Sequence, residues 1–354
     1  MTFLRSRIFR SLQPLLAVLI GLVIGLLITR LAGENPWHVL KILINSAFGS
    51  RYDIGMTLFY ATPLILTGLA VAIPFQAGLF NIGAEGQLTL GALAAAAVGC
   101  VFPDIPWPLA PVLAVLAAFF VGGFWGFIPG WLHAKRGSHE VINTIMLNFI
   151  AAGIASWVTL YVLKNPESQN PETKAVGAGY LIHHFQSFGD APLSSAFVLA
   201  VVAAILVSVF LWRTVLGFQL RAVGQGESAA RTAGIDSGKM KIIAMFLAGG
   251  LAGLVGVGEV LGNAGRFRLG FSPEYGFIGI AVALLGKNRP AGVVAAALLF
   301  GALHKGTSDL DLETENVTRD LSLILQALII LSVSAVGLWD WFNKGRPMVN
   351  GGRT

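Results

Sequence analysis

Long apolar segments separated by short polar stretches are the feature that most constrains how this chain can fold. A helix needs about 20 apolar residues to cross a hydrocarbon core of roughly 30 Å. Segments of this kind recur throughout the 354 residues, and we place ten of them at about 12–32, 56–74, 84–102, 109–133, 141–163, 193–212, 242–262, 276–286, 291–304 and 321–339. The sequence therefore predicts an all-α, polytopic integral membrane protein in which some transmembrane segments are short or broken.

The scarcity of charge supports this fold class and excludes several functions. Only 12% of the residues are charged, about half of the roughly 25% found in soluble domains. A soluble enzyme, a disordered chain or a nucleic-acid-binding domain of this size needs more charged surface. The chain also has one cysteine and no catalytic or metal-binding pattern such as His-Glu-x-x-His or Gly-x-Ser-x-Gly. We therefore expect no catalytic residue, no metal site, no nucleic-acid partner and no cofactor bound to this chain.

The distribution of charge predicts an orientation. The segments at 276–286 and 291–304 are short, since eleven helical residues cover only about 16 Å, and they either cross twice or form a re-entrant pair. With ten crossings, fifteen of the 24 Lys and Arg residues lie on one side together with both termini. Merging the pair into one span would move the basic tail to the outside. Because cytoplasmic loops carry the excess of Lys and Arg, we expect both termini to be cytoplasmic.

No soluble domain fits between the apolar segments, so we expect one transmembrane domain over residues 1–354. The most unusual polar stretch is 213–241, which we call the coupling segment. Within it, Glu227 suits the first turn of a helix, because a carboxylate favours the positive end of the helix dipole. Gly234 is placed to end that helix. The pattern predicts a short helix with small residues on several faces, exposed to the cytoplasm; the alternative is a solvated loop that only connects two spans.

Three sequence blocks carry a resemblance to a known family. They are FNIGAEGQL at 80–88, GFQLRAVG with ESAARTAGI at 217–224 and 227–235, and LLGKNRPAG at 284–292. Their order and sequence resemble ABC-importer permeases of the ribose and nucleoside type, a branched-chain-like permease family. The most similar members are the nucleoside-uptake permeases that work with binding lipoproteins of the basic-membrane-protein type. The similarity extends over most of residues 56–340.

The resemblance implies a transporter subunit that is not itself an enzyme. Its short helix would sit in a groove of a separate cytoplasmic ATPase, which would bind ATP and Mg²⁺, since this chain has no Gly-x-x-x-x-Gly-Lys-Ser/Thr motif. The resemblance also implies a second, related permease as heterodimer partner, a substrate-binding lipoprotein or periplasmic protein, and multi-pass insertion in the bacterial cytoplasmic (inner) membrane. The residues assigned to ATPase coupling are Arg221, Glu227, Ser228, Ala230, Arg231 and Gly234.

Polar side chains at membrane depth mark either packing contacts or a substrate pathway. The helix that ends near Gly78 restarts near Asn81, and interrupted helices point to substrate sites in transporters. In the segment 141–163, amides could bind ribose hydroxyls or base edges. The alternative for each cluster is structural, with Asn81 capping a helix and the other amides joining neighbouring helices. The candidate pathway residues are Asn81, Glu85, Gln87, Asn143 and Asn148.

Two arginines run against the positive-inside bias, because Arg266 and Arg268 follow the predicted outer end of the segment 242–262. With Glu259 they are our predicted residues for an outer gate or for docking a binding protein. The alternative is that the arginines form salt bridges with Glu259 or Glu274.

These inferences together predict a permease that imports nucleosides by alternating access, coupled to a separate ATPase. One alternative is the same machinery importing a pentose or another simple sugar. A second alternative is an ion-driven secondary carrier. Such a carrier needs several intramembrane carboxylates, whereas only Glu85 and Glu259 qualify here.

Overall fold

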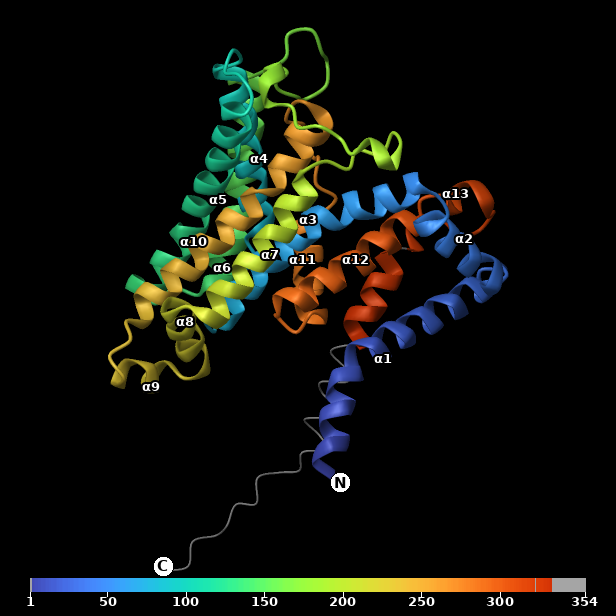
Figure 1. Cartoon of the computed structure of the whole chain (residues 1–354), viewed down its shortest axis with the longest axis horizontal. Helices are drawn as coiled ribbons and strands as arrows, with labels where there is room; N and C mark the ends of the chain where they lie inside the picture. The colour runs from blue at the N-terminus through green and yellow to red at the C-terminus, as the bar shows by residue number, and fades with distance from the viewer. Residues whose placement is uncertain (1, 322, 333–354) are drawn as a thin grey trace, which may run out of the picture. The chain divides into compact units, whose positions relative to one another are not determined.

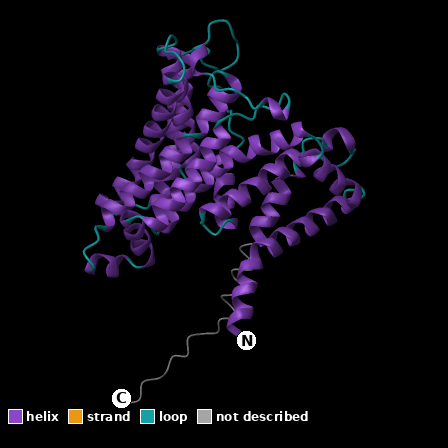
Figure 2. Ribbon diagram, viewed as in Figure 1, coloured by secondary structure: helices purple, strands orange, loops and turns teal. Residues whose placement is uncertain are grey.

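The computed structural model describes residues 2–321 and 323–332, and these form helices and loops, with only isolated bridges in place of strands (Figure 2). Seven helices are long and apolar enough to cross a membrane, and shorter apolar helices cover Leu16–Leu31, Tyr275–Leu285 and Leu323–Ser332. Each of the ten predicted segments coincides with one of these helices, which confirms the all-α polytopic class. The part of segment 321–339 beyond residue 332, and the basic tail used to orient the C-terminus, lie outside the described residues.

The labelled helices can be followed in Figure 1. In chain order they are α1 (Thr2–Leu31), α2 (Pro36–Phe48), α3 (Arg51–Gln76), α4 (Ala84–Val101), α5 (Leu109–Arg136), α6 (Glu140–Trp157), α7 (Ala196–Arg213), α8 (Val215–Gln225), α9 (Glu227–Thr232), α10 (Ser237–Gly253), α11 (Tyr275–Leu285), α12 (Pro290–Gly306) and α13 (Leu310–Glu313). Two π-helical stretches extend α6 and α10, at Val158–Val162 and Val257–Ala264, and two 3₁₀ turns lie in the loop after α6, at Ala178–Tyr180 and Gln186–Phe188.

The chain divides into two compact units, of which the first comprises residues 1–43 and those from 307 onward. In it α1 packs against the helix Leu323–Ser332 at Gly21 and Gly25, where an added Cβ would overlap Ile329 and Leu325. Small residues let transmembrane helices approach closely in this way. The expectation of a single domain over the whole chain stays a prediction.

The second unit, residues 44–306, is a bundle whose centre is α3. The charged residues of α3 lie near its start, and every residue from Ala61 to Pro74 is buried. The closest helix pair is α5 with α10, which meet along glycines: an added Cβ on Gly249 would overlap the carbonyl oxygen of Gly122, and the reverse also holds. The glycines of segment 242–262 therefore serve close helix packing.

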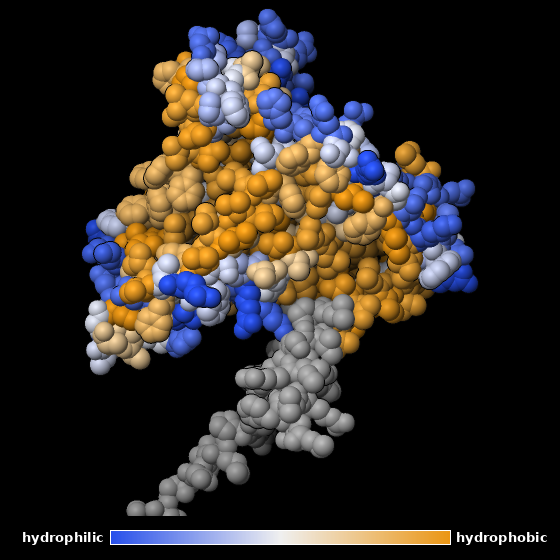
Figure 3. Space-filling model, viewed as in Figure 1, coloured by the Kyte–Doolittle hydropathy of each residue, from blue (hydrophilic) through white to orange (hydrophobic). Residues whose placement is uncertain are grey.

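The two ends of the second unit differ in structure. Figure 1 shows the short helices α8 and α9 at one end and the loop 164–193 at the opposite end. Between these ends, the face drawn in Figure 3 is covered by apolar side chains, with hydrophilic ones gathered at both extremities. This is the distribution expected of a membrane-spanning unit.

Two helices of the second unit end at the α8 side with the same backbone motif. After α3, the N–H of Leu79 donates to the carbonyl of Pro74 (2.9 Å) and Gly78 is left-handed, with φ of 76°. After α11, the N–H of Asn288 donates to the carbonyl of Ala283 (2.8 Å) and Lys287 takes the left-handed place, with φ of 53°. This pattern is a Schellman motif. The Gln76 Nε2 group joins the two turns by donating to the carbonyl of Asn288 at 3.0 Å.

Candidate functional site

The first candidate site begins at the interruption between α3 and α4. After Gln76 the chain turns back alongside α3, because Asn81 Nδ2 donates to the carbonyl of Ala70 at 3.2 Å. Ala70 lies six residues inside α3, about 9 Å along its axis. The helix α4 starts at Ala84 and thus within the thickness of the bundle. The predicted break is confirmed, and the new helix begins three residues after Asn81.

Asn81 and Gln87 form a closed pair of amides at this interruption. Asn81 Nδ2 donates to Gln87 Oε1 at 2.9 Å, and Gln87 Nε2 donates back to Asn81 Oδ1 at 3.1 Å. The Asn81 oxygen also accepts the N–H of Gly83 at 3.0 Å. Both side chains are buried, at 0% and 1% exposure, and buried amides with this many partners hold a backbone in one conformation. Their geometry favours the structural alternative over substrate contact.

The amides of α6 play different roles. Asn148 Oδ1 accepts the N–H of Gly86 at 2.9 Å and its Nδ2 donates to the carbonyl of Ile82 at 3.0 Å. It therefore ties the middle of α6 to the first turn of α4. Asn143 instead donates to the Ser138 hydroxyl at 2.7 Å, in the loop before α6, and the structure does not bring it to the interruption.

Glu85 joins two helix starts. Its Oε2 accepts the N–H of Gly276 at 2.8 Å, at the first turn of α11. A carboxylate is favourable there because the first N–H groups of a helix lack partners within the helix and carry the positive end of its dipole. Glu85 was predicted for the substrate pathway, and the structure shows that it caps a helix far along the chain from its own.

A cavity of about 250 Å³ opens beside Glu85, and we call it the α4 cavity. It lies between the first turns of α4, the outer half of α6 and the segment that leads into α11. Its lining residues are Glu85, Gly86, Thr89, Asn148, Ala152, Ala155, Ser156, Phe267, Leu269, Gly270, Phe271 and Ser272. The wall combines a carboxylate and three hydroxyls with the edge-to-face ring pair of Phe267 and Phe271. Such a mixture suits a ligand with an apolar ring and several hydroxyls.

Helical spacing could have revealed part of this wall from sequence. Thr89 lies one turn after Glu85, and Ser156 lies two turns after Asn148 with small residues between them, which places each pair on one helix face. The segment 267–272 has no comparable signal, because only the fold brings it to α4 and α6.

The second candidate site is the coupling segment, which the structure resolves into α8 and α9. Thr214 caps α8, its hydroxyl accepting the N–H of Gly217 at 3.0 Å. The predicted short helix is present as α9, and Gly234 follows it with φ of 80°. The Ile235 N–H bonds to the Ala230 carbonyl and the Gly234 N–H to that of Arg231, which completes a Schellman motif. The sequence analysis did not predict α8.

The side chains of α9 fall into two groups. Ala230 is 4% exposed and packs against Val223 and Met240, so it anchors α9 to α8 and α10. Ser228 and Ala229 are exposed on the other face. Outside α9, the side chain of Arg221 bonds to residues of its own unit. Its Nε donates to the Leu211 carbonyl at 3.0 Å, and its guanidinium lies 4.1 Å from the centre of the Trp212 ring. The small surface available to another protein is therefore centred on Ala229.

Glu227 fixes the position of α9. Its Oε1 accepts Arg231 Nη2 at 2.7 Å and Ser237 Oγ at 3.0 Å, and its Oε2 accepts Lys241 Nζ at 2.8 Å. The Lys241 hydrogen bond, followed by the Ser237 bond and the two cationic charges, outweighs the effect of burial and lowers the pKa of the Glu227 carboxyl from 4.5 to about 2. The carboxylate therefore stays charged at physiological pH.

At the end opposite α8 and α9, Arg266 and Arg268 pair with an acid that we did not expect. Arg266 Nη1 lies 2.7 Å from Glu172 Oε1, and Arg268 Nε lies 3.4 Å from Glu172 Oε2. The proposed alternative partners, Glu259 and Glu274, are thus incorrect. Burial acts to raise the pKa of Glu172, but hydrogen bonds from Ser168 and Arg266 and the Arg266 charge outweigh it and lower that pKa.

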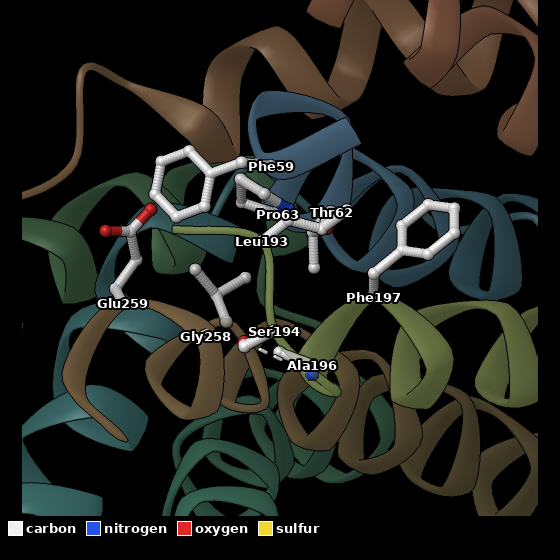
Figure 4. Close-up of a pocket in the computed structure, with 10 residues that line it drawn as sticks. Phe59, Thr62, Pro63, Leu193, Ser194, Ala196, Phe197, Gly258 and Glu259 are labelled. Carbon is white, nitrogen blue, oxygen red and sulfur yellow. Dashed lines mark hydrogen bonds between the residues drawn. The ribbon is translucent and has the colours of Figure 1, made fainter. Parts of the chain in front are cut away.

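Glu259 lies inside the unit and away from the outer surface, with 8% exposure. Figure 4 shows its carboxyl group directed toward the ring of Phe59. Asn263 Nδ2 donates to one oxygen at 3.4 Å, and the other oxygen has no hydrogen-bond partner among the described residues. The adjoining pocket, with Thr62 and Ser194 in its wall, has a volume of only about 10 Å³, room for at most one water. Glu259 is therefore not available for docking a protein in this conformation.

Together these features describe a multi-pass membrane protein with a cavity beside an interrupted helix and a short polar helix at one end of the bundle. Residues 54–334 match the family described as the permease component of the branched-chain amino acid transport system. The chain belongs to this family.

Within this family, the chain is similar to several individual ABC transporter permeases. The chain is 38% identical to the guanosine ABC transporter permease protein NupP of Bacillus subtilis, over 93% of this chain and 94% of NupP. It is 35% identical to the nucleoside ABC transporter permease protein NupB of Lactococcus lactis, over 92% and 91%. It is also 35% identical to the glucose ABC transporter permease protein TsgB13 of Haloferax volcanii, over 90% and 85%.

Proposed function

We propose that the protein is the permease subunit of an ATP-driven importer of nucleosides. The observation that carries the coupling part of this proposal is α9, a short helix that exposes small residues and is fixed to the bundle by Glu227. A separate ATPase would bind this surface, hydrolyse ATP with Mg²⁺ and drive alternating access. This assignment also sets the orientation. The protein would lie in the cytoplasmic membrane, with α9 and the basic residues near it on the cytoplasmic side.

The cargo assignment is supported by two relatives whose names specify guanosine and nucleosides, and by the mixed wall of the α4 cavity. A phenylalanine ring can stack on a nucleobase, while Glu85 and the cavity hydroxyls can bond ribose hydroxyls. A simple sugar is the second candidate, because the glucose permease TsgB13 is nearly as similar and because the same polar groups suit a sugar.

A second, related permease is the proposed membrane partner. The chain also matches a second guanosine permease of Bacillus subtilis, NupQ, at 30% identity over 69% of this chain. In Lactococcus lactis it likewise matches NupC, at 25% over 69%. Two unequal relatives in each organism support a heterodimer, with a substrate-binding lipoprotein or periplasmic protein delivering the cargo outside.

The test is ATP-dependent uptake of labelled guanosine and labelled glucose by proteoliposomes that contain the full complex. We expect guanosine uptake that requires ATP, and a loss of uptake and of ATPase binding in the variant Ala229→Arg. Ala229→Ser, which keeps the exposed face small, is the matched control. Uptake of glucose but not guanosine would overturn the cargo, and uptake driven by an ion gradient without the ATPase would overturn the whole proposal.

A further inference from the structure

A continuous line of polar side chains leaves the coupling segment and ends on α6. We call it the Glu227 network, and its members are Arg231, Glu227, Lys241, His133 and Glu140. Lys241 lies near the start of α10 and bonds Glu227 on one side and His133 Nε2 on the other, at 2.8 and 3.2 Å. His133, in the last turn of α5, places its Nδ1 3.1 Å from Glu140 Oε2, in the first turn of α6.

The partners of His133 fit one tautomer of its ring. The Lys241 ammonium group carries only donors, so His133 Nε2 is the acceptor in this contact. The proton of a neutral imidazole then sits on Nδ1, which donates toward Glu140 and toward the Ser138 carbonyl at 3.0 Å. The imidazole thus links a cation on α10 to an anion on α6, with one hydrogen bond on each side.

The inner part of this network is shielded from solvent. The side chains of Lys241, Glu140 and His133 are 12%, 14% and 22% exposed. Exposed ion pairs contribute little because water and salt screen them, whereas partly buried charges are screened far less. We therefore expect a displacement of Glu227 to reach Glu140 through charges that water screens only weakly.

The far end of the network leads back to the α4 cavity. Glu140 and Asn148 lie eight residues apart on α6, about 12 Å along one helix. Asn148 holds the first turn of α4 and lines the cavity. A rotation or axial shift of α6 at Glu140 must therefore move Asn148 against Gly86, beside Glu85.

We propose that His133 is the positioning residue through which movement of α9 reaches α6 and opens or closes the α4 cavity. This inference rests on the proposed coupling of α9 to an ATPase and adds the route that the movement takes. The links act in series, so that breaking any one of them disconnects the cavity from the ATPase while leaving both ends intact.

The test measures guanosine transported per ATP hydrolysed in proteoliposomes of the complete complex. His133→Asn keeps a donor near the Nδ1 position and loses the acceptor for Lys241, whereas His133→Ala loses both links. Because the links are in series, we expect both variants to lower the transport ratio equally, by roughly tenfold for the loss of one charge-assisted hydrogen bond. ATP hydrolysis should remain. His133→Gln, whose side-chain oxygen reaches the Nε2 position but which loses the Nδ1 donor to Glu140, should lower the ratio by the same factor.

Lys135→Gln is the matched control, since Lys135 is an exposed residue of the same helical turn outside the network. It should leave the ratio unchanged. The inference is overturned if His133→Asn and His133→Ala transport with the normal ratio, or if uptake and ATP hydrolysis fall together with the thermal stability of the complex. If the proposed function were wrong, the result would differ: the unsubstituted complex would transport guanosine without ATP.

Discussion

The carboxylate of Glu85 caps the first turn of α11 by accepting the Gly276 N–H at 2.8 Å, across 191 residues of sequence. Two helices that both begin inside the bundle therefore share one charge. The positive ends of both dipoles point at the carboxylate, and the α4 cavity opens beside it.

Removing this cap should destabilise the second unit. We expect Glu85→Ala to cost about 1–2 kcal/mol, the range for losing a capping carboxylate, because the Gly276 N–H is then left without its partner. Glu85→Gln keeps an acceptor oxygen and should cost less. Thermal unfolding of the purified protein in detergent measures both, and equal melting temperatures for Glu85→Ala and the unsubstituted chain would contradict the capping role.

Filling the α4 cavity should stop transport without unfolding the protein. Ser156 lies in the cavity wall on α6 and is partly exposed, so the ring of Ser156→Phe can enter the 250 Å³ space rather than a packed core. We expect guanosine uptake to fall to background, while Ser156→Ala, which removes only a hydroxyl, retains most of it. Normal uptake by Ser156→Phe would show that cargo does not pass this cavity.

The glycine contact between α5 and α10 should tolerate no added carbon. An alanine Cβ at position 249 would overlap the Gly122 carbonyl oxygen, so we expect Gly249→Ala to destabilise the protein by about 1–3 kcal/mol, as overpacking does. Gly153 is the control: its α6 site has open space around it. Gly153→Ala should be neutral or stabilising by about 0.5–1 kcal/mol. Thermal unfolding in detergent distinguishes them, and similar melting temperatures for the two variants would contradict this assignment.

The lowered pKa of Glu227 gives a prediction for pH. A carboxyl whose pKa is depressed on folding stabilises the folded state fully above its ordinary value of 4.5, and that stabilisation is lost only as the pH falls toward about 2. Glu227 is therefore charged at every pH between 5 and 8. We expect Glu227→Gln to lower ATP-dependent uptake by the same factor throughout this range, in proteoliposomes buffered on the ATPase side. A defect that disappears near pH 5 would mean that the native carboxyl is already protonated there.

Local patterns in the sequence predict the helices and their ends. Apolar runs locate the spans, Gly78 marks the interruption before α4, and Glu227 with Gly234 marks the bounds of α9. These features depend on residues within a few turns of each other, which share one helix or one turn whatever the rest of the chain does. The missed helix α8 had such signals as well, since Thr214 caps it and Leu220 and Val223 form its buried side.

The partners of the polar residues could not be predicted in the same way. Glu85 meets Gly276, Arg266 meets Glu172 and Lys241 meets His133 across 191, 94 and 108 residues. Spacing along one helix carries no information about which other helix lies beside it. Asn81 and Gln87, which we predicted for the pathway, bond to each other across only six residues, a local contact that the sequence also left unspecified. Phe271 was not predicted either, because only packing brings the segment 267–272 to the cavity.

The seam of glycines between α5 and α10 has a mechanical consequence. Where backbone touches backbone, no layer of side chains remains that could change rotamers and let one helix slide past the other. We therefore expect α5 and α10 to stay in register along the seam throughout the transport cycle, with any relative movement confined to the helix ends beyond it. Beside the seam, Phe119 of α5 and Leu251 of α10 line a cavity that separates this pair from Leu206 on α7, so α7 can shift without breaking a backbone contact.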